Sequence, residues 1–195
     1  EGEKVEFYIE GSGGYAISNI DLLSHEIYFT KQELIASLEP IIYFGSQREY
    51  PQASEIFRDV LVDALNSLNE RSRFTLSLEE TPLSQEGPLR ISNNQLRKIR
   101  KSLLYIADGT AIVQGGEDHS YLIASPKVCI ELGYAISTKK SEQILLTQME
   151  RPDLSGEFTF DLPKHQHLKY KSGKDLAKTL PKTLKALLKK FNLFS

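Results

Sequence analysis

The stretch SPKVCIELGYAIST, residues 125–138, carries one carboxylate on an otherwise apolar helical pattern. Between Val128 and Ile136, Glu131 is the one side chain with a full charge at neutral pH. A carboxylate held against an apolar surface has a raised pKa and a strong local field, which suits acid–base chemistry or stabilisation of a cation. Glu131 is therefore the candidate catalytic residue. The alternative, which the pattern alone favours, is a glutamate that reaches water or pairs with an arginine.

The elements that would position Glu131 alternate along the chain from Pro40 onward. We expect buried strands at 40–46, 74–80, 102–109, 143–149 and 167–172. We expect helices at 50–70, 93–102, 125–138 and 173–194. This alternation is typical of right-handed βαβ units, which build a parallel sheet covered by helices on both faces. The predicted fold class is α/β, with a flavodoxin-like, doubly wound, five-stranded parallel sheet in the order 2-1-3-4-5.

Residues 1–39 do not follow the alternation. A β-hairpin is expected around residues 11–14, where the sequence reads GSGG. Thr30 and Glu33 have the spacing of a capping box, which predicts the start of a helix. We therefore divide the chain into 1–39, a small hairpin-and-helix appendage or the end of an upstream segment, and 40–195, the main domain.

In a doubly wound sheet, ligands bind beyond the carboxyl ends of the strands, where the strand order reverses. The residues expected there follow the first and third strands or begin the helix of Glu131, in which Ser125 is a good N-cap. The candidate substrate-binding residues are Gly45, Ser46, Gln47, Asp108, Thr110, Ser125 and Tyr134. We expect Gly45, Ser46, Asp108 and Glu131 to line one pocket.

Composition excludes several classes of function. With 40% hydrophobic residues and a net charge of −2, the chain can bury a core but has no global attraction for nucleic acid. No apolar run approaches the roughly 18 residues of a membrane span. A single cysteine, Cys129, points to a reducing compartment, and cytoplasmic localisation is expected. Metal-ligand spacing and dinucleotide or P-loop motifs are lacking, so no metal and no resident cofactor are expected.

The runs SLLYIADGT, SPKVCIELGYA, QILLTQ and FDLPKHQHLKY resemble the bacterial TIR-like, nucleotide-binding domains of antiphage defence systems. The shared pattern is a strand ending in Ala-Asp-x-Thr, a Glu-Leu-Gly-Tyr-Ala helix, an apolar strand and a Phe-Asp-Leu turn. Nucleoside 2-deoxyribosyltransferases are similar across the same Asp and the same helix string. The resemblance covers roughly residues 40–172 and is most specific between Asp108 and Ala135.

The resemblance implies that Glu131 faces the ribose of a bound nucleotide or dinucleotide. It further implies a TIR-like domain over 40–195 that cleaves the N-glycosidic bond of NAD, as a hydrolase acting in defence or signalling, with NAD as substrate rather than cofactor. Self-association or a partner domain is then expected. Two alternatives stay open: a non-catalytic module that binds a nucleotide signal and acts through protein partners, and a deoxyribosyltransferase-like enzyme.

Overall fold

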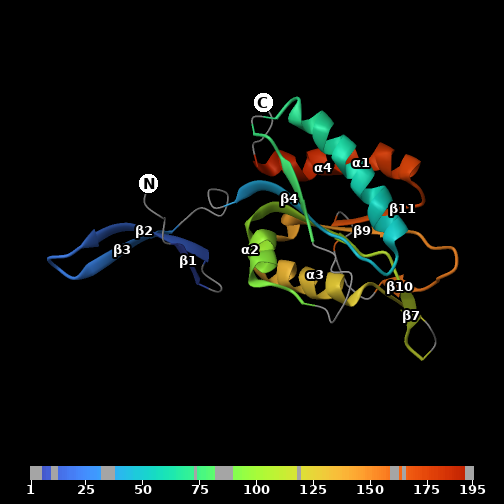
Figure 1. Ribbon diagram of the computed structural model, residues 1–195, viewed down its shortest axis with the longest axis horizontal. Helices are drawn as coiled ribbons and strands as arrows, with labels where there is room; N and C mark the ends of the chain where they lie inside the picture. The colour runs from blue at the N-terminus through green and yellow to red at the C-terminus, as the bar shows by residue number, and fades with distance from the viewer. Residues whose placement is uncertain are drawn as a thin grey trace. The chain divides into compact units, whose positions relative to one another are not determined.

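Five strands form the central sheet of the larger of two units in the chain (Figure 1). They are β4 (Glu39–Gly45), β5 (Ser77–Glu80), β6 (Ser102–Asp108), β9 (Ile144–Met149) and β11 (His167–Tyr170). The strands are parallel and lie in the order β11-β9-β6-β4-β5. Numbered along the chain this order is 2-1-3-4-5, so the predicted flavodoxin-like, doubly wound sheet is confirmed.

The computed structural model describes residues 6–9, 13–31, 38–72, 74–81, 90–117, 120–158, 163 and 166–191. Contacts divide the chain into two compact units, Glu1–Glu39 and Pro40–Ser195. Among the helices of these described ranges, none combines the length and the hydropathy needed to cross a bilayer.

Two helices cover each face of the central sheet (Figure 1). One face carries α1 (Pro51–Asn69) and α4 (Gly173–Leu188); the other carries α2 (Asn93–Lys101) and α3 (Pro126–Thr138). Short 3-10 turns lie at Ser141–Gln143 and Lys189–Phe191. Each helix turns an apolar stripe to the sheet, as in α4, where Leu176, Leu180 and Leu184 are buried.

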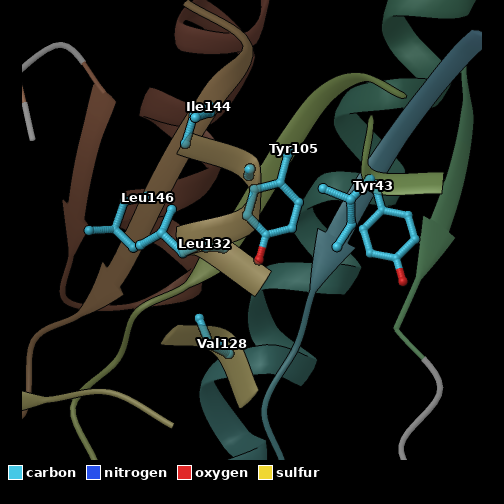
Figure 2. Packing of buried hydrophobic residues seen from close by; sticks show 9 residues of the cluster. Tyr43, Tyr105, Val128, Leu132, Ile144 and Leu146 are labelled. Atoms are coloured by element: carbon cyan, nitrogen blue, oxygen red, sulfur yellow. The ribbon is translucent and has the colours of Figure 1, made fainter. Parts of the chain in front are cut away.

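The centre of the α2 and α3 face is an apolar cluster around two tyrosines. Tyr105 of β6 lies between Tyr43 of β4 and Leu132 of α3 (Figure 2). The rings of Tyr43 and Tyr105 are stacked, with centroids 6.2 Å apart. A buried tyrosine needs a hydrogen-bond partner for its hydroxyl, so these two rings bring polar atoms into this core.

The connection between β6 and α3 contains secondary structure of its own. β7 (Val113–Gly115) and β8 (Tyr121–Ile123) pair antiparallel, and β10 (Glu157–Phe158) pairs parallel with β8. Together they form a second, three-stranded sheet in the order β10-β8-β7. The chain therefore returns to the start of α3 through a hairpin.

The smaller unit is an antiparallel sheet of β1 (Glu6–Ile9), β2 (Gly13–Asp21) and β3 (Glu26–Lys31). The predicted hairpin is present between β1 and β2. No helix begins at Thr30, because Thr30 lies in β3 and pairs with Ala16, so that part of the prediction is wrong. The β-branched and aromatic residues of β3 favour strand pairing over the capping box. The rest of the predicted helix, 32–37, lies outside the described residues.

Candidate functional site

Glu131 is fully buried, at 0% exposure, one and a half turns into α3. The hydroxyl oxygen of Thr81, which follows β5, lies 3.1 Å from both carboxylate oxygens. Tyr105 donates a longer hydrogen bond to Oε2, at 3.5 Å. Thr81 Oγ1 also lies 3.3 Å from the Tyr43 hydroxyl. Because Thr81 has one proton, its donation to Glu131 leaves its oxygen to accept from Tyr43. We call these four residues the Glu131 cluster.

Gly45, at the carboxyl end of β4, lies against the Glu131 cluster. A methyl group on Gly45 would lie 2.8 Å from Oε2 of Glu131 and 2.5 Å from the Tyr105 hydroxyl oxygen. The structure thus brings together two residues that the sequence placed in the site. The Glu131 carboxylate points to the end of β4 and not into bulk water, so the alternative of a solvated surface glutamate does not hold.

Burial controls the ionisation of the Glu131 cluster. It raises the pKa of Glu131 to about 7, against the opposing effects of the Lys127 charge and of the Thr81 and Tyr105 hydrogen bonds. Burial is also the main cause that raises the pKa of Tyr43 to about 12 and the pKa of Tyr105 well above its ordinary value. Both tyrosines therefore stay neutral donors, while Glu131 exchanges its proton near neutral pH.

Asp108 belongs to a different cluster, on the α1 side of the sheet. Its Oδ2 accepts a 2.6 Å hydrogen bond from Ser54 of α1, and its Oδ1 accepts a 3.0 Å bond from the Thr110 amide. Gln47 joins this Asp108 cluster, because its Nε2 donates to the Thr110 carbonyl and its amide donates to Ser54 Oγ. Burial raises the pKa of Asp108, and the hydrogen bonds from Ser54, Thr110 and Gln47 oppose that shift.

The structure does not bring Asp108 to Glu131. Side chains alternate between the faces of a strand. Tyr105 and Ala107 of β6 face α3, so Asp108, the next residue, faces α1. The single pocket expected for both carboxylates is therefore replaced by two clusters on opposite faces, both at the carboxyl edge of the sheet.

Three predicted site residues are fully buried at that edge: Ser46, Gln47 and Ser125. Ser125 is the N-cap of α3, but its side chain makes no capping hydrogen bond. Tyr134, in α3, is the remaining predicted residue. It is partly buried against the apolar cluster that contains Tyr43 and Tyr105.

A cleft lies beside the Glu131 cluster, between β5 and α2. Its volume is about 330 Å³, and it is lined by Tyr43, Glu80, Arg90, Ser92, Asn94, Gln95 and Lys98. Tyr43 connects this cleft to Glu131, because its hydroxyl contacts Thr81 and Thr81 contacts the Glu131 carboxylate. Lys98 at the rim is held by a 2.7 Å ion pair to Glu79.

Sequence reasoning missed Thr81, Tyr43 and Tyr105. A signal existed for the tyrosines, since a phenol inside a buried strand must find a polar partner. Thr81 directly follows the run 74–80 that was predicted as a strand, at the same carboxyl edge of the sheet. Across the described residues, no group of three or more His, Cys, Asp or Glu side chains could hold a metal ion.

Comparison with known proteins gives no family for the chain: no protein-family model, no curated protein and no solved structure matches it.

Proposed function

We propose that residues 40–195 form a TIR-like domain that binds a nucleotide or dinucleotide at the carboxyl edge of the sheet and cleaves the N-glycosidic bond of NAD. The observation that carries the proposal is the Glu131 carboxylate, buried, held by Thr81 and Tyr105, and placed against Gly45 where the strand order reverses. Crevices at such reversals are the ligand sites of doubly wound sheets.

The chemistry suits one buried carboxylate. As the bond between C1′ and the nicotinamide nitrogen breaks, its electron pair goes to the cationic nicotinamide, which leaves neutral and needs no acid. Positive charge builds on the ribose, and a fixed carboxylate in a low-dielectric site stabilises that charge. Water then adds at C1′ and loses a proton. The ionised form of Glu131 is the active form, so turnover is expected to rise with pH through about 7.

The cleft beside Tyr43 supports the binding half of the proposal. Its volume, about 330 Å³, lies at the lower end of the range for small-molecule sites. A nucleoside portion seated there would be separated from the Glu131 carboxylate by the hydroxyls of Tyr43 and Thr81.

A second candidate function is nucleotide binding without catalysis, with the signal passed to a protein partner. One observation favours it: Glu131 is 0% exposed, and the Thr81 hydroxyl lies 3.1 Å from each of its oxygens. Direct contact with a ribose requires these neighbours to move. In this function Glu131 senses the ligand through Thr81 and Tyr43 and does not touch it.

The experiment is to incubate the purified chain with NAD over a range of protein concentrations, with and without a crowding agent, and to measure free nicotinamide. Glu131→Gln keeps the shape of the side chain and removes its charge. Glu70→Gln is the matched control, because Glu70 is exposed at the end of α1 far from the carboxyl edge. We expect release by the wild type and Glu70→Gln, and none by Glu131→Gln.

Two results would change the proposal. Equal release by Glu131→Gln removes Glu131 from the mechanism. No release by any variant at any concentration, together with saturable binding of NAD, favours the binding module. The concentration series matters because we propose self-association, and a site completed by a second copy gives specific activity that rises with concentration.

A further inference from the structure

Three buried polar atoms at the carboxyl edge have no hydrogen-bond partner among the described residues: Ser46 Oγ, Gln47 Oε1 and Ser125 Oγ. All three side chains are 0% exposed. A buried polar atom without a partner destabilises a protein, so native structures keep few of them. Their concentration at one edge indicates a polar group that this edge is built to receive. We call the three residues the edge group.

The edge group is gathered by the loops that surround it. Gln47 is fixed to the connection after β6, because its Nε2 donates to the Thr110 carbonyl at 2.9 Å. The β7–β8 hairpin closes on the hydrogen bond from the Ile112 amide to the Ile123 carbonyl, at 2.9 Å. This bond brings the segment after Thr110 and the segment before Ser125 together at the base of the hairpin. Gln47 is therefore bonded to the residue that leads into this hairpin, Ser125 follows the hairpin, and Ser46 adjoins Gln47.

Ser125 also places the edge group at the N-terminus of α3. The amides of a first helical turn have no acceptor within the helix, and the Ser125 side chain takes none of them. The helix dipole adds partial positive charge at this end. Burial lowers the pKa of Lys127, in the same turn, and the nearby carboxylates Glu131, Glu49 and Glu80 oppose that shift, so Lys127 lies near the ends of β4 and β5. Donors and positive charge thus converge where the serine hydroxyls are unpartnered.

We infer that the N-terminus of α3 is a phosphate site, so that the ligand is a phosphorylated nucleoside and not a free nucleoside. The Ser46 and Ser125 hydroxyls, the first-turn amides and Lys127 donate to the phosphate oxygens. Gln47 Oε1 can only accept, and it takes a hydrogen bond from a ribose hydroxyl. The inference rests on the proposed function in one respect, that the ligand is built on a nucleoside.

The test compares two ligands that differ by one phosphate, nicotinamide mononucleotide and nicotinamide riboside. Calorimetric titrations are run in the Glu131→Gln background, where the glycosidic bond stays intact. We expect the mononucleotide to bind at least about tenfold more tightly, the scale of a hydrogen bond to a charged group. Ser46→Ala and Ser125→Ala should each weaken the mononucleotide about tenfold and leave the riboside unchanged. Inorganic phosphate should compete with the mononucleotide alone.

A measurement of the melting temperature tells whether the Ser125 hydroxyl serves a ligand or stabilises the fold. Ser125 Oγ has no partner among the described residues, so Ser125→Ala should keep or raise the melting temperature. Ser172→Ala is the matched control, because Ser172 is the N-cap of α4 and its Oγ accepts from the Asp175 amide at 3.3 Å. That control should lower the melting temperature and leave mononucleotide binding unchanged.

The inference is overturned if both ligands bind equally, if the advantage of the mononucleotide survives both serine substitutions, or if Ser125→Ala lowers the melting temperature as Ser172→Ala does. Equal binding of the two ligands removes only the phosphate site at α3 and leaves the proposed cleavage of NAD at Glu131 standing. Failure of both ligands to bind removes the inference and the proposed function together.

Discussion

Gly45 and Glu131 meet at the carboxyl end of β4, with no room between them for a side chain. A methyl group on Gly45 would lie 2.8 Å from the Glu131 carboxylate and 2.5 Å from the Tyr105 hydroxyl. The Gly45 Cα hydrogens therefore form one wall of the Glu131 cluster. Glycine at this position is needed for close approach and not for an unusual backbone angle, since Gly45 is not among the described glycines with positive φ.

Gly45→Ala should therefore destabilise the domain by about 1–3 kcal/mol, the usual cost of overpacking a well-filled interior. Urea denaturation measures the change. The matched control is Gly133→Ala in α3, where an added methyl group meets nothing within 4 Å. A glycine inside a helix costs about 0.5–1 kcal/mol relative to alanine, so this control should be stabilising. A Gly45→Ala variant as stable as the wild type would show that the Glu131 cluster relaxes without cost.

The order of the central sheet could be predicted because its inner strands are buried on both faces. β6 is buried at all seven positions, which makes it a continuous apolar run bounded by turn residues. Helices of the expected lengths separate such runs, and the handedness rule leaves few topologies. The secondary structure of the smaller unit was harder to predict, because the capping-box spacing of Thr30 and Glu33 conflicts with the β-branched and aromatic residues before it. In the structure, strand pairing prevails at Thr30.

The site could be predicted only in part, for a related reason. Complete burial of β6 erases the polar–apolar alternation that would show which face Asp108 occupies. The sequence therefore placed Asp108 with Glu131, although Asp108 is bound to Ser54 on the other face. Thr81 lies after the short strand β5, and nothing in its local sequence shows that α3 brings a carboxylate to its hydroxyl. That contact depends on how α3 packs on the sheet.

The stability of the domain should depend on pH through Glu131. Its pKa is about 7 in the folded chain and about 4.5 in the unfolded chain. Between these values the folded state binds more protons, so the free energy of unfolding falls as pH rises from 4.5 to 7. At about 1.4 kcal/mol per pKa unit the loss approaches about 3 kcal/mol.

Glu131→Gln should remove most of this dependence, because glutamine resembles the protonated acid. The variant should match the wild type at pH 4 and exceed its stability by up to about 3 kcal/mol at pH 8. Denaturant titrations at the two pH values measure the difference. The exposed Glu70→Gln should track the wild type at both pH values. A Glu131→Gln variant less stable than the wild type at pH 8 would mean that the carboxylate is stabilised in its charged form.

The Asp108 cluster should depend on Ser54. Ser54→Ala removes the 2.6 Å hydrogen bond to a buried carboxylate and should cost about 1.5–3 kcal/mol of unfolding free energy. Ser67→Ala is the control on the same helix, because its exposed hydroxyl donates to the Asp63 carbonyl one turn earlier. That substitution should change stability by less than about 0.5 kcal/mol. Equal effects of the two substitutions would show that Asp108 finds another donor when Ser54 is lost.

Lys139, at the C-terminal end of α3, should give a pH dependence of the opposite sign. It is 8% exposed, and its Nζ donates to the backbone carbonyls of Ser102 and Arg100 at the end of α2. Burial lowers its pKa from 10.5 to about 7. Between pH 7 and 10.5 the unfolded chain binds the extra proton, so the free energy of unfolding rises with pH. The rise has an upper bound of about 5 kcal/mol, because the two carbonyls also favour the charged amine.

Lys139→Met keeps the apolar stem of the side chain and removes the titrating amine. The variant should lose stability at pH 9, where the neutral amine of the wild type still donates to both carbonyls, and should show a flatter profile between pH 7 and 10. Lys178→Met, at an exposed position of α4, is the matched control and should follow the wild-type profile. Free energies of unfolding at five or more pH values give the slope for each protein. A wild-type slope that survives in Lys139→Met would assign the alkaline stabilisation to another group and leave Lys139 a charged cap of α2.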